Sequence, residues 1–339
     1  MVVRSRIAGV ASVLPPHRMS TVEVEQRLAA GGLSGWTPPP GMIERLTGVR
    51  HRHVAPPGDN ASDLAAAAAA KLLAETGVAA ADVDLLIFAS ASQDMVEPAT
   101  AHMVSARLGT QCPVFDVKNA CNSFLNGVQV ADALVRTAAH RRVLVVTGET
   151  PSRAVRWRIG SRAQFAESLP GYTLSDGGAA MLVERAADEG AAGIELLRFA
   201  ASSTAWGVGT LPGGGSAHPH DPDAGYFRFD SRRLREAFEA AGPGLFLDGL
   251  AELGITWDDV AMVGLHQVAV GHAAEIARRC GIPGHLLQLT VAEHGNLAAA
   301  SLPLQLSLAS QAARCGPGDR IVLLGLAGGI SLGILVAVL

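Results

Sequence analysis

The chain has 339 residues, of which 49% are hydrophobic and 17% are charged, and its formal net charge is −4. This balance gives no sign of binding to nucleic acid or to an anionic membrane, and the length suffices for one large or two medium-sized domains. No run of about 18 apolar residues is present to span a bilayer, and the N-terminus lacks the apolar segment of a signal peptide. The four cysteines show no metal-finger spacing, which favours a reduced, cytoplasmic protein.

Short apolar, β-branched runs alternate with longer helical patterns along most of the chain. In chain order, strands are predicted at 83–90, 113–117, 142–149, 178–184, 193–202, 260–266, 321–328 and 331–339. Helices are predicted from Ser62 or Asp63 to Gly77, around 101–109, and at 122–139, 272–281 and 297–313. This alternation is typical of an α/β fold. The region 151–235 breaks the pattern, and its Gly/Pro/His/Asp-rich stretch 211–226 is predicted to be a surface or lid element.

The two halves of the chain follow one order of elements. In both 83–149 and 260–328, a strand leads to a helix, a second apolar run leads to a second helix, and a further strand ends the set. The identity between these segments is negligible, so the argument rests on order and spacing. We predict a duplicated α/β fold with halves at 1–185 and 186–339, whose equivalent turns meet at a central seam.

Cys121 lies at the turn between the run 113–117 and the helical pattern that follows it. A free cysteine is often a packing residue. At the first turn of a helix, however, unbonded N–H groups and the positive end of the helix dipole lower the pKa of a thiol and make it a better nucleophile. Asn119, Asn122 and Ser123 are polar where a structural helix start could be apolar. We therefore expect Cys121 to be a nucleophile with a lowered pKa.

Two residues of the second half complete a chemical set with Cys121. His266 ends a strand, and Asn296 lies at the turn equivalent to that of Cys121. Singly, His266 is compatible with a hydrogen-bonded structural histidine and Asn296 with a helix N-cap. Together with a thiol that takes an acyl group, two neutral donors can polarise a thioester carbonyl and hold an enolate.

These three positions carry a family resemblance. DVKNACNSFLNGV resembles the nucleophile motif of the 3-ketoacyl-ACP synthase III family of the thiolase superfamily, GLHQ resembles its histidine motif, and EHGNLAAASLPLQL resembles its asparagine motif. LTGVRHRHVAPPGDNASDLA, VVTGETPSR, LSDGGAAMLVE and LLGLAGGISLG match in the same order, so the resemblance covers nearly the whole chain. It implies a five-layered α-β-α-β-α thiolase fold and, usually, a homodimer.

The resemblance also implies roles. Cys121 would carry the acyl group, and the backbone N–H groups of Cys121 and Gly328 would form one oxyanion hole. His266 and Asn296 would stabilise the enolate made when a malonyl thioester loses CO₂. The substrates would be acyl-CoA or acyl-ACP, with no metal or redox cofactor. Asn296 disfavours the classes that use a Cys-His-His set, and the C-terminal glycine loop lacks the second cysteine of the thiolases.

Several positions depart from the family pattern. Ala269 and Gly271 stand where an asparagine and a basic residue are common, and Met42 stands where primer enzymes carry a tryptophan that stacks on CoA. These changes favour an enzyme of polyketide or other natural-product metabolism. Two alternatives stay open: an acyltransferase that moves the acyl group to a hydroxyl or amine without loss of CO₂, and a degenerate partner subunit.

The remaining polar groups are interpreted as surface. His218, His220, Asp221 and Asp223 match no defined metal-ligand spacing. Arginines gather at 153–162 and at 232–235, where a solvated surface is the default interpretation. An acidic carrier protein or the phosphates of CoA would nevertheless need arginines near the mouth of a substrate tunnel. Glu149 is expected to shape the site without carrying a step.

Overall fold

Two β-sheets, one from each half of the chain, organise the fold. The computed structural model describes residues 4–31, 36–186 and 192–339. The first sheet has the strand order β1-β7-β6-β4-β5 and the second has the order β11-β12-β13-β8. The strands of the first sheet are β1 (Ser5–Val13), β4 (Leu85–Ala89), β5 (Val114–Val117), β6 (Arg142–Glu149) and β7 (Gly177–Arg185). Those of the second are β8 (Gly193–Ala201), β11 (Met262–Leu265), β12 (Arg320–Ala327) and β13 (Ser331–Val338).

The sheets confirm the predicted duplication. In the first, β4 is parallel to β6, β6 is antiparallel to β7, and β7 is antiparallel to β1. In the second, β11, β12, β13 and β8 repeat this sequence of pairings. The counterpart of β5 is reduced to one bridge between Val263 and Leu287, because the chain enters the short helix α10 (Val291–His294) soon afterwards. The boundary proposed between residues 185 and 186 stays a prediction, and residues 187–191 lie outside the described part of the chain.

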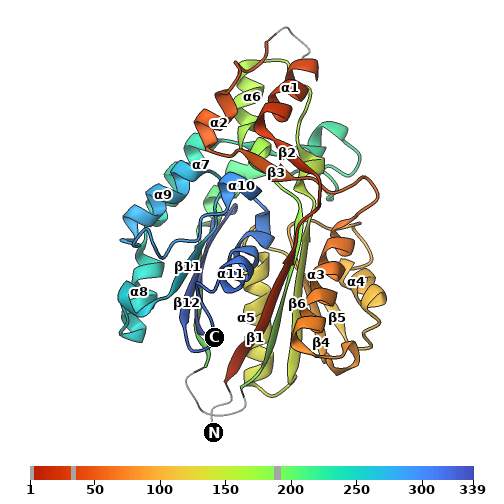
Figure 1. Ribbon diagram of the computed structural model, residues 1–339. Helices are drawn as coiled ribbons and strands as arrows, with labels where there is room; N and C mark the ends of the chain where they lie inside the picture. Colours follow the sequence, from red (N-terminus) through yellow and green to blue (C-terminus); the bar gives the residue numbers. More distant parts are fainter. Residues whose placement is uncertain (1–3, 32–35, 187–191) are drawn as a thin grey trace.

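Helices fill and cover the two sheets in five layers (Figure 1). Three of the layers are helical. The helices outside the first sheet are α3 (Ala61–Thr76) and α4 (Thr100–Leu108), those between the sheets are α5 (Ser123–Arg136) and α11 (Ser301–Gln311), and those outside the second sheet are α8 (Gly244–Leu253) and α9 (Val270–Arg279). One buried cluster joins the middle three layers, with Val145 and Met181 from the first sheet, Leu125 and Leu306 from the helices, and Leu335 from the second sheet. Burial of apolar side chains on both faces of each sheet is what stabilises such a stack.

The start of α3 differs from the sequence-based prediction. The helix begins at Ala61 with Asn60 as its N-cap, rather than at Ser62 or Asp63. The carboxylate of Asp63 instead accepts a hydrogen bond from the N–H of Asn60 at 2.8 Å. Asp63 therefore stabilises the helix start from inside the first turn, which is the place of the acidic partner in a capping box.

Smaller elements gather at one end of the layers, at the top of Figure 1: β2 (Arg18–Ser20), α1 (Thr21–Gly31), α2 (Met42–Thr47), β3 (His51–His53) and α6 (Arg162–Ser168). The remaining elements before α8 are β9 (Gly209–Thr210), β10 (Arg228–Phe229) and α7 (Ser231–Ala241), which lies beside α9 in the same view. The stretch 211–226 is largely exposed, as predicted. Among the described helices, none combines the length and the apolar character needed to cross a membrane.

Candidate active site

The polar residues around Cys121 hold its turn against the second half of the chain. The Nδ2 group of Asn122 donates to the backbone oxygen and to Oγ of Ser331, both at 3.0 Å, and Asn119 Nδ2 reaches the same Oγ at 3.3 Å. Ser123 Oγ accepts from Asn119 N–H at 2.8 Å and donates to the carbonyl of Ala120 at 2.7 Å. Since Ser331 begins β13, these bonds place the half-buried Cys121 at the seam between the two sheets.

The prediction that the pKa of the Cys121 thiol is lowered is wrong. Burial and the negative charge of Glu149 raise the pKa of Cys121 to about 12, and the backbone hydrogen bond at the helix start opposes them only weakly. The helix-dipole argument considers only the turn itself. Desolvation and a nearby carboxylate come from other elements, and both disfavour the charged thiolate.

His266 follows β11 and is buried, with 3% of its surface exposed. Its backbone N–H donates to the carbonyl of Leu324 in β12 at 2.9 Å, which extends the β11–β12 ladder to the histidine. Burial, together with the nearby His272, lowers the pKa of His266 to about 3. His266 is therefore a neutral imidazole at physiological pH, and a neutral imidazole can donate a hydrogen bond without acting as a strong acid.

Asn296 is fixed by backbone of the first half. Its N–H donates to the carbonyl of Thr173 at 2.7 Å, and its carbonyl accepts from Ser175 N–H at 2.9 Å. Its Oδ1 accepts from Ala298 N–H at 3.0 Å, so part of the predicted N-cap role is present. With Oδ1 used in this way, the Nδ2 group is the end of the amide that can donate to a ligand.

Two glutamines that the sequence interpretation assigned no role hold the residues next to His266 against the segments on either side of Asn296. Gln305, on α11, accepts from Leu265 N–H at 3.0 Å and donates to the carbonyl of Leu265 at 2.9 Å. Gln267 donates to the carbonyl of Gln288 at 2.7 Å and accepts from Thr290 N–H at 3.0 Å. The strand that ends at His266 is thereby fixed to both segments that flank Asn296. The sequence does carry a signal for this role, because Gln305 is a polar residue within the otherwise apolar helical run LPLQLSL.

The proposed oxyanion glycine, Gly328, lies in the turn between β12 and β13. The same two strands meet the Cys121 turn at Ser331, as described, and at Gly325. A Cβ on Gly325 would lie 2.1 Å from Oδ1 of Asn122, so this close approach requires glycine. The assignment of the Gly328 N–H to an oxyanion hole stays a prediction.

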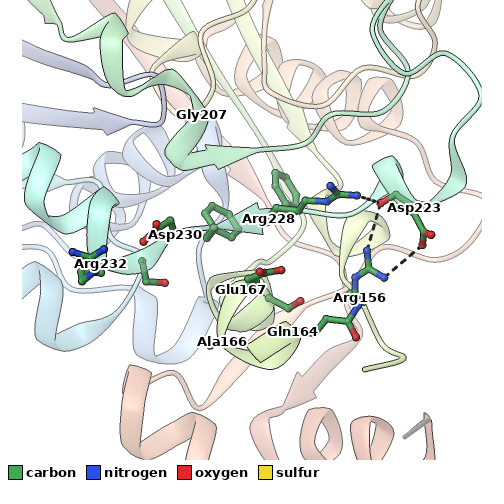
Figure 2. A pocket seen from close by; sticks show the side chains of 13 residues that line it. Arg156, Gln164, Ala166, Glu167, Gly207, Asp223, Arg228, Asp230 and Arg232 are labelled. Carbon is green, nitrogen blue, oxygen red and sulfur yellow. Dashed lines mark hydrogen bonds and ion pairs between the residues drawn. The ribbon is translucent and has the colours of Figure 1, made fainter. Parts of the chain in front are cut away.

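Both arginine clusters contribute to cavities. A cavity of about 750 Å³ between α6, β10 and the start of α7 is lined by Arg156, Arg228 and Arg232. Figure 2 shows Arg156 and Arg228 pointing at Asp223, whose backbone oxygen accepts from Arg228 at 2.9 Å and whose carboxylate lies 3.7 Å from Arg156. Asp223 thus balances part of this positive charge. The predicted surface loop 211–226 contributes to the wall of this cavity.

A second cavity, of about 350 Å³, lies between α7, α8, α9 and the second sheet. Its lining is mostly apolar, with Phe238 and Phe246 on the helices and Leu326 and Leu332 on the strands that flank the Gly328 turn. His272 also lines it and acts electrostatically on His266. This cavity therefore reaches the strand ends that carry the candidate site.

The histidine-rich loop gives no metal centre. His218 lies 3.9 Å from Asp221, and both side chains are about half exposed. Within the described ranges, no group of three or more His, Cys, Asp or Glu side chains is placed to hold a metal ion.

Comparisons with known proteins agree with this fold. The family model described as 3-oxoacyl-[acyl-carrier-protein (ACP)] synthase III matches residues 115–203, and that of its C-terminal part matches 250–339. The β-ketoacyl-[acyl-carrier-protein] synthases III of Sphingopyxis alaskensis and Rhodospirillum rubrum are each 33% identical to this chain. The alignments cover 97% of this chain in both cases, and 97% and 98% of those proteins.

Solved structures show the same architecture. Xanthomonas campestris OleA with bound lauric acid and lauroyl-CoA has a TM-score of 0.88 at 27% identity, over 99% of both chains. A crystal structure of a 3-oxoacyl-(acyl-carrier-protein) synthase III has a TM-score of 0.88 at 25% identity, over 99% of this chain and 100% of that one. The predicted thiolase fold is confirmed, and the molecule is a condensing enzyme of the transferase class. The chain belongs to the 3-oxoacyl-ACP synthase III family.

Proposed function

We propose that the protein condenses an acyl group, carried on Cys121, with a malonyl-type thioester that loses CO₂. The observation that carries this proposal is that buried hydrogen bonds fix the turns of Cys121, His266 and Asn296 in place. Ser331 holds the Cys121 turn, and Gln305 and Gln267 align the strand that ends at His266 with the segments around Asn296. A nucleophile and two neutral donors are therefore held on rigid elements, as condensation requires.

The proposed reaction has two half-reactions. In the first, the sulfur of Cys121 attacks the carbonyl of an acyl-CoA or acyl-ACP, the new C–S bond replaces the old one, and the proton of the thiol leaves with the released CoA or ACP thiol. The N–H groups of Cys121 and Gly328 stabilise the tetrahedral oxyanion. In the second, the malonyl thioester loses CO₂, and its enolate carbon attacks the acyl carbonyl; the C–S bond to Cys121 breaks, and the released thiolate takes up a proton from solvent to restore the thiol.

His266 and Asn296 act in the second half-reaction as donors to the enolate oxygen. A pKa of about 3 for His266 means that its imidazole is neutral when the substrate binds. Two neutral donors polarise the thioester carbonyl without protonating it, so electron density stays available for carbon–carbon bond formation. No metal or redox group is required by these steps.

The cavities support a thioester substrate on a long arm. The 350 Å³ cavity is lined by Leu326 and Leu332, which flank the Gly328 turn, and by Arg235 and Arg279, which both pair with Glu239 in the same lining. A mostly apolar cavity beside the Gly328 turn suits the long arm of an acyl-CoA or acyl-ACP substrate. We place the enzyme in the cytoplasm and in specialised, polyketide-type metabolism rather than in the housekeeping priming of fatty-acid synthesis.

We further propose a homodimer formed at the edge of the first sheet. β5 is the last strand of that sheet and exposes Phe115, and Met95 and Val96 are exposed in the segment before α4. An unpaired edge strand beside apolar side chains favours pairing with a second copy. Light scattering after size exclusion tests this, with Phe115→Glu expected to give monomers.

Intact-protein mass spectrometry tests the proposed reaction. The protein is incubated with a panel of acyl-CoAs beside a Cys121→Ala variant, and malonyl-ACP is then added. A single acyl adduct that is absent from the variant, and is discharged with release of CO₂, supports the proposal. No adduct from any CoA or ACP donor contradicts it and leaves a degenerate partner subunit.

A second candidate function has its own supporting observation. Ala269 precedes α9 and Gly271 lies in its first turn, where relatives often carry an asparagine and a basic residue, and Gly271 lines the 350 Å³ cavity. The smaller side chains leave room for an acceptor other than a malonyl carrier. Discharge of the adduct by an alcohol or an amine, without CO₂, identifies this acyltransferase.

A further inference from the structure

Glu149 is a fully buried carboxylate at the end of β6 that the proposed steps leave unused. One of its oxygens accepts from Ser90 Oγ at 2.9 Å and from Ala91 N–H at 2.8 Å, and the other accepts from Ser92 Oγ at 2.7 Å. The backbone N–H of Ala299 also hydrogen-bonds to it. Burial without a cation is costly for a carboxylate, and hydrogen bonds of this number compensate in part.

These contacts join both halves of the chain. Ser90, Ala91 and Ser92 follow β4 of the first sheet, whereas Ala299 is the middle residue of the short helical turn Ala298–Ala300 that follows Asn296 in the second half. Glu149 therefore fixes one loop of the first half to the start of the central helix of the second. Ser90, whose hydroxyl donates to Glu149, also donates its backbone N–H to the carbonyl of Val117 at 3.2 Å, at the end of the strand that leads to Cys121. Because β6, β4 and β5 are neighbours in the sheet, Glu149 and the Cys121 turn lie at the same sheet edge, where the carboxylate acts electrostatically on the thiol.

Charge distinguishes Glu149 from an ordinary structural residue. The groups that hydrogen-bond to it are two serine hydroxyls and two backbone N–H groups, and the titratable group on which its charge acts is the thiol of Cys121. A negative charge close to a thiol in a buried site destabilises the thiolate. Because burial raises the pKa of Glu149 to about 7, its charge changes near neutral pH.

We propose that Glu149 is a positioning residue of the condensing site whose charge restrains the nucleophile: when ionised it disfavours the thiolate of Cys121, and when protonated it releases that restraint. This inference deepens the proposed function and rests on Cys121 as its nucleophile. The restraint limits reaction of the resting thiol with electrophiles other than the bound acyl donor. It also makes the reactivity of the Cys121 thiol depend on the charge of Glu149, which lies at the end of β6.

Asp176 provides a matched control. It too is fully buried and accepts hydrogen bonds from backbone and serine groups, from Ala55 N–H at 2.8 Å and from Ser152 N–H and Oγ at 3.0 and 2.6 Å. Burial raises its pKa as well. The groups that shift the pKa of Cys121 include Glu149 but not Asp176. Loss of a buried carboxylate in general can thus be separated from loss of this particular charge.

The test is the rate of alkylation of Cys121 by iodoacetamide as a function of pH, followed by mass spectrometry of the peptide that contains it. Glu149→Gln removes the charge and keeps the shape, and we expect alkylation near pH 8 to be about tenfold faster, because a close like charge shifts a pKa by at least about one unit. Glu149→Asp, which keeps the charge, should stay close to the parent, and Asp176→Asn should leave the profile unchanged.

Two results would overturn the proposal: a Glu149→Gln profile that superimposes on that of the parent, or an equal acceleration in Asp176→Asn. If Glu149→Gln does not fold, Ser92→Ala serves instead, since loss of its hydrogen bond makes ionisation of Glu149 harder and should accelerate alkylation in the same direction. An unchanged Ser92→Ala profile then counts against the proposal. Alkylation requires no thioester substrate, so its outcome is independent of whether condensation occurs.

Discussion

The Cys121 turn and the Asn296 turn occupy equivalent places in the two halves, and they differ in what surrounds them. Each precedes a helix of the central layer, α5 or α11. The Cys121 turn is tied to β13 through Asn122, and its half-buried side chain lies near the charge of Glu149. The Asn296 turn is enclosed by backbone of the first half, at Thr173 and Ser175.

This difference shows how a duplicated fold acquires two chemical roles. Each half completes the other's turn: β13 of the second half holds the nucleophile, and the segment before β7 of the first half holds the amide donor. A site built in this way requires both halves, because each turn would lose the hydrogen bonds that it makes to the other half. On our proposal, the first-half turn loads the acyl group and the second-half turn activates the malonyl unit, and the following variants separate the two roles.

The largest expected effect comes from the first-half turn. Cys121→Ala should abolish the acyl adduct and lower condensation by more than about 10³-fold, because no other group forms the covalent intermediate. Adduct formation by mass spectrometry and product formation from malonyl-ACP are measured together. Cys112→Ala is the control, since that thiol is also partly exposed but lies before β5. An adduct that persists in Cys121→Ala would assign the nucleophile elsewhere.

Much of this could be predicted from the sequence, because periodicity and order are local signals. They predicted the α/β duplication, and the motif resemblance pointed to Cys121, His266 and Asn296 as the site. The thiol pKa was predicted wrongly because burial and Glu149 act from other elements. The structural role of Gln305 was also missed, since its partner Leu265 is 40 residues away in sequence.

A substitution of Asn296, in the turn of the second half of the chain, should affect condensation but not acyl loading. Asn296→Ala should keep the acyl adduct and lower condensation by about 10²–10³-fold, the usual cost of removing one oxyanion donor. Because Asn296 also caps a helix start, Thr256→Ala serves as the control: it removes another cap, with Asp258 N–H as its partner, at an exposed turn. If Asn296→Ala and Thr256→Ala lowered condensation equally, Asn296 would act only as a structural cap.

His266 should make the stability of the protein depend on acid pH. Its folded-state pKa is lowered to about 3, so the unfolded chain binds a proton more readily as the pH falls below about 6.5, and folding then becomes less favourable. From pH 6.5 to pH 4 this should cost about 3 kcal/mol of unfolding free energy. Urea unfolding of the parent and of His266→Asn at several pH values measures it. The difference between the two curves should grow toward low pH, and parallel curves would contradict the assignment.

The smallest effect is expected from a substitution at Gly325, which tests the contact between β12 and the Cys121 turn. A methyl group there would meet Oδ1 of Asn122 at 2.1 Å and Leu125 at 2.9 Å, and Asn122 cannot move away without losing its bonds to Ser331. Gly325→Ala should therefore cost about 1–3 kcal/mol of stability, as overpacking of a core does, and should slow acyl loading of the adjacent Cys121. Gly316→Ala is the matched control, because a Cβ at Gly316 meets nothing within 4 Å. If Gly325→Ala loads at the parental rate while it is destabilised, the contact between β12 and the Cys121 turn stabilises the fold without positioning the nucleophile, and Ser331 alone would hold the turn in place.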